Sequence, residues 1–191
     1  MSSRSIYSTA LLKDGELTAN YIADCLGKDI TIVDACANVG GNTQWFSRKF
    51  KTVLACEINP NDFKRLVNNM NLYDYKNIIF YNKSCLDVLN VEKYDCIFFD
   101  PPWGGKEYKF VKNLGLSLDS ISMTDIIQKY LPRTKCIVYK HPTNAVLPDK
   151  NKIKTVHFIV SYTGVEKILY VLSFYSLFPL DVSRIPSNVY I

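Results

Sequence analysis

The sequence predicts an α/β fold in which a parallel sheet ends in an antiparallel hairpin. From residue 30 onward, short runs of β-branched or aromatic residues alternate with longer segments of helical spacing, which is typical of parallel strands joined by crossover helices. Near the end of the chain, only a short turn containing Gly164 separates two strand-like runs, so these two strands must pair antiparallel. The chain has 191 residues, of which 48% are hydrophobic and 21% charged, and this composition excludes disordered, collagen-like and coiled-coil proteins.

The elements are expected in a regular order along the chain. A first helix begins after Thr18, because Tyr21, Ile22, Cys25 and Leu26 follow at amphipathic spacing. Parallel strands are predicted at 30–35, 52–57, 77–81, 94–99 and 135–140, and the hairpin strands at 155–162 and 166–175. Helices are predicted at 43–50, 61–72, 86–90 and 122–131. We expect residues 1–17 to form a short arm and residues 18–191 to form one domain.

Charge and cysteine usage narrow the class of protein. Lys and Arg number 23 against 18 Asp and Glu, and the resulting charge of +5 weakly favours an anionic partner such as RNA, DNA or a nucleotide. The six cysteines form no CxxC pair, and His141 and His157 are too few for a metal site, so we expect no metal and no disulfides. His157 is expected on an exposed strand face. No apolar run is long enough to span a bilayer, so we expect a protein inside the cell, in the nucleus or cytoplasm. We also expect a monomer.

The turn after the first strand is built for close approach of a ligand. It runs from Asp34 to Thr43 and consists largely of small residues, with a glycine pair before the next helix. Glu57 follows the second strand about 20 residues later, where a carboxylate can accept hydrogen bonds from both ribose hydroxyls of an adenosine cofactor. The turn lacks the G-x-G-x-x-G spacing that NAD requires, so S-adenosylmethionine, which has no phosphate, fits better. Asp34 could hold the methionine ammonium or have a capping or structural role instead.

The fourth predicted strand ends in the most specific motif, Asp100-Pro101-Pro102-Trp103. Consecutive prolines remove amide donors, which leaves carbonyls beyond the strand available as acceptors. Asp100 and the Pro101 carbonyl could hold the two N–H bonds of an exocyclic amine while its lone pair faces a methyl sulfonium. Trp103 offers a flat face for a purine. The competing interpretation is a proline turn whose tryptophan only fills the core.

These segments resemble trimethylguanosine synthase, the family that methylates the exocyclic N2 of a 7-methylguanosine cap. The resemblance rests on 34–43, on Glu57 and on 101–105 followed by Tyr108, and it extends over about residues 16 to 178. It implies a Rossmann-like S-adenosylmethionine-dependent methyltransferase that acts on capped RNA. It also implies that Trp103 stacks on 7-methylguanine, whose positive charge favours a cation–π contact. Lys140 to Asn144 resemble the family's segment after the fifth strand.

Three sets of residues make up the predicted site. The catalytic set is Asp100, Pro101 and Trp103. The cofactor set is Asp34, Cys36, Asn38, Gly40, Asn42, Thr43, Glu57, Ser84 and Asp100. The substrate set is Pro102, Trp103, Tyr108, Lys140 and Asn144. The sequence departs from the family in two ways: Ser84 replaces the acid that faces the adenine amine, and only a short arm with Tyr7 stands for the aromatic N-terminal extension. A compact enzyme of viral origin is one hypothesis that fits this arm.

Three other functions remain open from the sequence. Methylation of adenine N6 in RNA or DNA uses the same amine chemistry with a base flipped onto Trp103. The order of Lys13, Asp100, Lys140 and Glu166 is similar to the tetrad of ribose 2′-O-methyltransferases, in which a lysine helps to deprotonate a hydroxyl. An inactive scaffold that binds RNA or S-adenosylmethionine is the third, although the presence of both Glu57 and the Asp100 motif argues against it.

Overall fold

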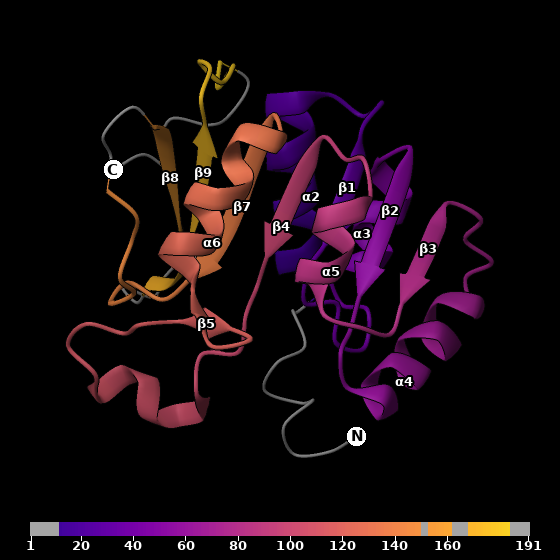
Figure 1. Ribbon diagram of the computed structural model, residues 1–191. Coiled ribbons are helices and arrows are strands. Elements are labelled where there is room, and N and C mark those ends of the chain that lie inside the picture. The colour runs from indigo at the N-terminus through magenta and orange to yellow at the C-terminus, as the bar shows by residue number, and fades with distance from the viewer. Residues whose placement is uncertain (1–11, 150–152, 162–167, 184–191) are drawn as a thin grey trace. The chain divides into compact units, whose positions relative to one another are not determined.

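The computed structural model describes residues 12–149, 153–161 and 168–183, and it contains two compact units, Met1–Phe98 and Phe99–Ile191 (Figure 1). The first unit holds four strands, β1 (Thr31–Asp34), β2 (Thr52–Cys56), β3 (Ile78–Tyr81) and β4 (Cys96–Phe99), the last of which carries the chain into the second unit. β1 pairs in parallel with both β2 and β4, and β2 pairs in parallel with β3. Asp34, at the end of β1, is in register with Ala55 and Phe98. The inner strands are buried along nearly their whole length, as expected for parallel strands covered on both faces.

Four helices complete the described part of the first unit: α2 (Leu12–Leu26), α3 (Thr43–Lys49), α4 (Pro60–Asn71) and α5 (Cys85–Val91). Figure 1 shows α5 in front of these strands and α2 and α3 behind them. α4 begins where the side chain of Asn59 accepts hydrogen bonds from the amides of Asn61 and Asp62, with Pro60 at the first helical position. Leu66 and Met70 of α4 pack in a buried cluster with Ala37 and Ala55. This packing fixes α4 against the turn that follows β1.

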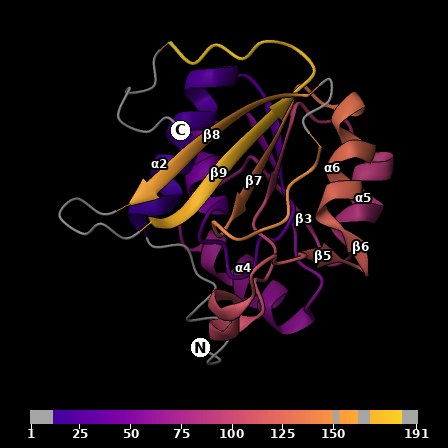
Figure 2. The same cartoon turned by 90° about the vertical axis from the view of Figure 1, so that its left-hand side faces the viewer.

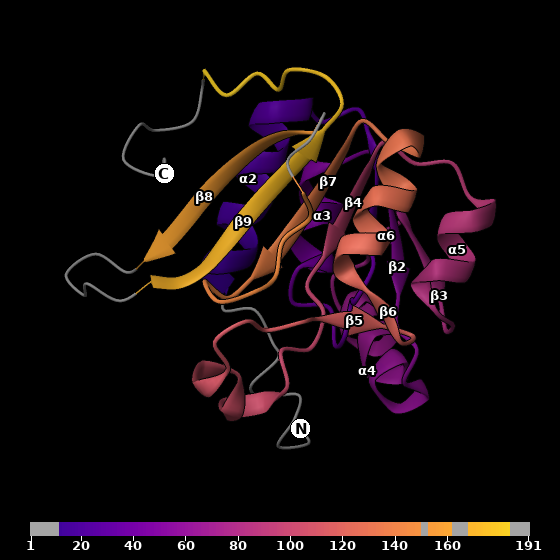
Figure 3. The same cartoon turned by 60° about the vertical axis from the view of Figure 1, so that its left-hand side comes forward.

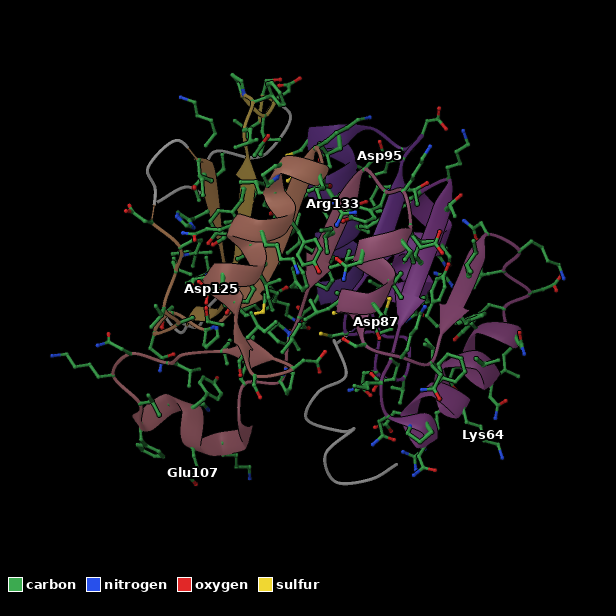
Figure 4. The ribbon with its side chains drawn as sticks, viewed as in Figure 1. Lys64, Asp87, Asp95, Glu107, Asp125 and Arg133 are labelled. Atoms are coloured by element: carbon green, nitrogen blue, oxygen red, sulfur yellow. The ribbon has the colours of Figure 1, made fainter. Side chains whose placement is uncertain are left out.

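The second unit combines a 3-10 turn, a small hairpin, a helix and three long strands. Its elements are η1 (Gly105–Phe110), β5 (Ser117–Leu118), β6 (Ile121–Ser122), α6 (Met123–Tyr130), η2 (Leu131–Arg133), β7 (Cys136–His141), β8 (Lys154–Ser161) and β9 (Ile168–Ser176). β9 pairs antiparallel with β7 on one side and with β8 on the other, and Figure 2 shows β8 and β9 as a long ribbon. The side chain of Ser122 caps α6 by accepting from the amide of Asp125. Figure 4 shows Asp125 at the start of this helix.

The predicted fold class is confirmed, since the sheet is mostly parallel and ends in the antiparallel β8–β9 hairpin. The predicted start of the first helix is wrong, because α2 begins at Leu12 and not after Thr18. The predicted arm therefore falls partly in α2 and otherwise outside the described residues. Gly15 explains the error, because a glycine in the sequence argues against a helix. In the structure, a Cβ on Gly15 would lie 2.5 Å from Trp45 Cδ1. Glycine is therefore needed for α2 to approach α3 this closely. No helix in the described ranges is both long and apolar enough to cross a membrane.

Candidate active site

The turn between β1 and α3 is closed by a pair of buried side chains. Asp34 is completely buried, and its Oδ2 accepts a hydrogen bond of 2.6 Å from the hydroxyl of Thr43. The Ala37 amide donates to the carbonyl of Cys56 at 2.9 Å, which ties the turn to the end of β2. Thr43 is itself fully buried, so within this structure its hydroxyl positions Asp34.

Asn38, Gly40 and Asn42 shape the inner side of the same turn. Asn38 and Gly40 have positive φ values of 49° and 98°, so the main chain doubles back tightly here. A Cβ on Gly40 would lie 2.7 Å from Met70 Cε and 3.0 Å from Leu66 Cδ1, so the turn rests directly on α4. Asn42 precedes α3 but makes no capping hydrogen bond with its side chain. Its amide group is therefore placed for another purpose than starting the helix.

Glu57 stands at the end of β2 with its carboxylate fixed by the main chain. Oε2 accepts from the amide of Asn38 at 2.9 Å, and Oε1 accepts from the amide of Asn59 at 2.8 Å. A carboxylate has about four acceptor positions, so Glu57 keeps acceptor capacity for a ligand. Burial raises the pKa of Glu57 above its ordinary value, and hydrogen bonds from the backbone amides of Asn59, Asn38 and Ile58 oppose that rise. The predicted ribose acceptor is thus oriented and partly desolvated before any ligand binds.

Ile58 and Asn82 lie beside this carboxylate and were not predicted from the sequence. Ile58 follows Glu57 and is 62% exposed, which is unusual for an isoleucine at the end of a buried strand. Asn82 follows β3, and its Nδ2 donates to the carbonyl of Glu57 at 2.8 Å. The side chain of Ser84 caps α5 by accepting from the backbone amide of Leu86 at 3.2 Å, and its contact with the cofactor stays a prediction. An exposed aliphatic side chain next to a strand-end acid is the signal that could have identified Ile58.

Two unpaired acceptors show whether S-adenosylmethionine fits these residues. Asn38 Oδ1 and Asn42 Oδ1 are buried and accept no hydrogen bond within the described part of the chain. Buried acceptors are nearly always paired, so both atoms suit a ligand that supplies donors. S-adenosylmethionine carries an ammonium group, two ribose hydroxyls and an adenine amine, all of which are donors. The donor and acceptor chemistry of the turn therefore fits this cofactor.

In the second unit, the residue that follows β4 is held by a lysine. Asp100 Oδ2 accepts a hydrogen bond of 2.8 Å from Lys140 Nζ, and both side chains are largely buried. Lys140 Nζ also lies 4.8 Å from the ring centroid of Tyr170, a cation–π contact. The ammonium contacts only one carboxylate oxygen in this geometry. Asp100 Oδ1 therefore keeps acceptor capacity.

Trp103 lies in a turn that hydrogen bonds from the Asn144 side chain hold in place. The Trp103 indole is half-buried and meets the Tyr108 ring edge-on, with 5.3 Å between centroids. Asn144 Nδ2 donates to the carbonyls of Tyr108 and Val111 at 2.8 and 2.6 Å, so both of its amide protons are used within the chain. Gly104 and Gly105 have positive φ values of 89° and 75° and turn the chain into η1, from which Glu107 points outward (Figure 4). The indole nitrogen of Trp103 is buried and has no partner among the described residues.

The structure groups the predicted residues in two sets. Those of the cofactor turn and Glu57 belong to the first unit, and Asp100, Trp103, Tyr108, Lys140 and Asn144 belong to the second. Of the tetrad expected for a ribose methyltransferase, Lys140 and Asp100 are brought together, while Glu166 and the side chain of Lys13 lie outside the described part of the chain. The expectation that His157 is exposed is wrong, because His157 is half-buried and bonded to Ser173.

A family model described as RNA cap guanine-N2 methyltransferase matches residues 30–173, about three quarters of the sequence and most of both units. The chain belongs to this family. A proposed methyltransferase from Streptococcus mutans, solved in complex with SAH, has a similar fold, with a TM-score of 0.55 and 14% identity over 84% of this chain and 96% of that one. The RNA cap guanine-N2 methyltransferase family and this fold identify the chain as an S-adenosylmethionine-dependent methyltransferase, as predicted.

Relatives of this family member come from a virus and from yeast. An uncharacterized protein of Acanthamoeba polyphaga mimivirus is 42% identical over 123 residues, covering 61% of this chain and 48% of the relative. The trimethylguanosine synthase of Saccharomyces cerevisiae is 26% identical over 137 residues, covering 68% of this chain and 44% of the relative. The chain thus spans about half the length of the curated relatives that it matches. An rRNA methylase from Streptococcus thermophilus shares the fold, with a TM-score of 0.58 and 12% identity over 85% of this chain and 95% of that one.

Proposed function

We propose that this methyltransferase transfers a methyl group to the exocyclic N2 amine of a 7-methylguanosine cap on RNA. The observation that carries the proposal is the Asp100–Lys140 pair next to the Trp103 turn. Lys140 contacts Asp100 Oδ2 at 2.8 Å, so Oδ1 keeps acceptor capacity three residues before a half-buried indole. An acceptor and a stacking surface on one short segment suit a purine amine.

The residues act mainly by positioning. When bound, S-adenosylmethionine supplies a methyl group made electrophilic by its sulfonium. Asp100 Oδ1 and the Pro101 carbonyl accept hydrogen bonds from the two N–H groups of the amine, and this directs the nitrogen lone pair toward the methyl carbon. Asp100 would also be the residue to take up the proton that the amine gives up when it is methylated. Asn38, Asn42 and Glu57 would hold the cofactor through its donors.

Lys140 separates this proposal from ribose methylation. A lysine that deprotonates a hydroxyl must be neutral. Lys140, in contrast, forms an ion pair with Asp100 and a cation–π contact with the Tyr170 ring. An ammonium in that position serves to hold the carboxylate. The ion pair therefore favours amine chemistry over hydroxyl chemistry.

Two amine acceptors remain, and the family and Trp103 favour guanine. The family model names the guanine N2 of an RNA cap, and the yeast relatives are trimethylguanosine synthases. A 7-methylguanine ring is cationic, so it gains a cation–π attraction over an indole that adenine lacks. Adenine N6 methylation uses the same residues without this gain. The mimivirus relative accords with the hypothesis of a viral origin.

A comparison of acceptors tests the proposal. The chain would be incubated with labelled S-adenosylmethionine and, in parallel, with a 7-methylguanosine-capped dinucleotide, the same dinucleotide with an unmethylated cap, and an adenosine oligonucleotide. We expect methyl transfer to the first acceptor at a rate at least tenfold above the other two. Preferred transfer to the adenosine oligonucleotide would reject the guanosine cap and support the adenine alternative.

A further inference from the structure

A small cavity in the second unit lies on one face of the β7–β9–β8 strands. It has a volume of about 250 Å³ and is lined by His141, Thr143, Leu147, His157, Ile159 and Val171. Figure 3 shows the segment after β7, which contains Thr143 and Leu147, turning back and running beside β7. Successive residues of a strand point to opposite faces, so His141 faces this cavity while Lys140 points to the other face. The cavity is therefore separate from the Asp100–Lys140 pair.

Hydrogen bonds fix the imidazoles of the cavity. His141 Nδ1 lies 2.8 Å from the carbonyl oxygen of Pro142, which can only accept, so Nδ1 carries the proton. His141 Nε2 then accepts from the hydroxyl of Ser173 at 2.6 Å, and the Ser173 oxygen accepts from His157 Nδ1 at 2.7 Å. Burial lowers the pKa of His141 to about 4, so this ring is neutral at neutral pH. The arrangement holds both rings in fixed orientations.

The chemistry of the lining selects one class of ligand. None of the six lining side chains is a carboxylate, an ammonium or a guanidinium, so the cavity offers nothing to neutralise a phosphate or an amine. Leu147, Ile159 and Val171 form apolar walls, and the His157 imidazole and the Thr143 hydroxyl provide polar edges. Apolar faces combined with a polar edge describe an uncharged planar heterocycle such as a nucleobase.

The wall of this cavity is joined to the turn that carries Trp103. Asn144, between Thr143 and Leu147, donates to the carbonyls of Tyr108 and Val111. The Leu114 amide donates to the carbonyl of Asn144 at 2.8 Å, and the Val146 amide donates to the carbonyl of Leu114 at 2.9 Å. These bonds connect the cavity wall to the segment that carries the proposed stacking surface for the cap guanine. An RNA chain that begins at that guanine needs a place nearby for its next base.

We propose that this cavity binds the nucleobase that follows the cap guanosine in the RNA chain. The inference rests on the proposed function and adds a second subsite to it. The subsite recognises the base and leaves the phosphates to solvent or to other residues. The proposal predicts that a capped dinucleotide binds more tightly than a ligand without the second base because of that base and not because of its phosphate charge.

The test compares two ligands of equal charge. One is a 7-methylguanosine triphosphate-linked adenosine, and the other is the same compound with an abasic ribose in place of the adenosine. Their affinities are measured by titration calorimetry on the full chain loaded with a non-reactive cofactor analogue, so the readout does not need methyl transfer. We expect the base to improve affinity about five- to tenfold, within the range of a stacked base. Equal affinities for the two ligands, or no binding of either, would overturn the proposal.

Two variants locate the effect within one segment. Leu147→Ala removes a wall of the cavity, and Val146→Ala is the matched control, because Val146 is 44% exposed and does not line the cavity. In Leu147→Ala the advantage of the base should fall below twofold with the affinity of the abasic ligand unchanged, and Val146→Ala should match the wild type. Retention of the full advantage in Leu147→Ala would place the base elsewhere. If both ligands bind as expected but neither is methylated on N2, the proposed function fails while the subsite stands.

Discussion

Glu57 is the residue on which cofactor affinity should depend most strongly. The backbone amides of Asn38 and Asn59 orient its carboxylate, which keeps acceptor capacity for the ribose hydroxyls. Glu57→Gln keeps the size but removes the charge, so S-adenosylmethionine binding should weaken by about 1.5 to 3 kcal/mol, as for hydrogen bonds to charged groups. Titration calorimetry measures the effect. An unchanged dissociation constant in the folded variant would mean that the ribose is held elsewhere.

The same residue gives cofactor binding a pH dependence. Protonation removes acceptor capacity from Glu57, so affinity should fall as the pH falls through its folded pKa. Because burial raises that pKa, the fall should begin at a higher pH than for an exposed glutamate. The dissociation constant measured across acidic pH checks this. Glu57→Gln should bind more weakly than the wild type above the folded pKa of Glu57 and lack this titration, and a wild-type profile identical in shape to that of Glu57→Gln would contradict the assignment.

Lys140 distinguishes a positioning role from that of a general base. Lys140→Arg keeps a cation beside Asp100 but cannot give up a proton, whereas Lys140→Met removes the cation. If Lys140 positions Asp100, the arginine variant should retain at least a third of the turnover, and the methionine variant should lose about tenfold or more. Turnover and cofactor affinity are measured on both. Equal inactivity of the two variants, with cofactor affinity intact, would favour a lysine base and ribose chemistry.

Trp103 should contribute to acceptor binding and not to cofactor binding. Trp103→Ala should weaken binding of a cap analogue by about 1 to 3 kcal/mol, and more for 7-methylguanosine triphosphate than for guanosine triphosphate. Trp103→Phe should retain part of the affinity. The competing interpretation, in which Trp103 fills the core, predicts a large fall in melting temperature together with loss of the cofactor. Melting temperature and both affinities, measured on the same variants, separate the two.

At the scale of elements, the cofactor turn depends on its contact with α4. Gly40 and Gly27 both have positive φ, but a Cβ on Gly40 would meet Met70 and Leu66, while a Cβ on Gly27 would meet no atom within 4 Å. Gly27→Ala should therefore cost only the backbone term of about 1 to 2 kcal/mol. Gly40→Ala should cost about 1 to 3 kcal/mol more through crowding.

Denaturant unfolding of both glycine variants provides the comparison, with the wild type as reference. Equal destabilisation would show that Met70 and Leu66 move aside at no cost and that the turn does not rest on α4. Gly40→Ala should also weaken cofactor binding, because Asn38 and Asn42 lie on the same turn. Gly27→Ala, at the end of α2, should leave cofactor binding unchanged.

The elements show what could be predicted from the sequence and why the rest could not. The strands were predictable because buried parallel strands need continuous apolar runs. The crossover helices were predictable because their apolar residues recur at helical spacing. The β5–β6 hairpin was not, because its turn places Asp119 and Ser120 at positive φ values of 49° and 64°, where the usual signal is Asn-Gly or Asp-Gly. Ser84 and Asn144 were predicted to contact ligands, and these contacts stay predictions. Their hydrogen bonds to Leu86 and to the Trp103 turn depend on tertiary contacts that the sequence does not display.

At the scale of the whole molecule, one chain carries the residues for both the cofactor and the proposed acceptor. Asp34, Asn42 and Glu57 belong to the first unit, and Asp100 and Trp103 follow as soon as β4 brings the chain into the second. The match covers about half of the length of the curated relatives, yet the family match of residues 30–173 includes all five residues. We therefore expect the chain by itself to transfer a methyl group to a capped guanosine.

The position of the transferred methyl group is the most direct measure of this expectation. The chain is incubated with S-adenosylmethionine carrying a heavy methyl group and with a 7-methylguanosine-capped dinucleotide, the product is digested to nucleosides, and the label is located by mass spectrometry. The account predicts a heavy methyl group on N2 of 7-methylguanosine, and none in a matched reaction with Asp100→Ala. A heavy methyl group on a ribose or on an adenine base, or none on the capped dinucleotide although the cofactor binds, would contradict it.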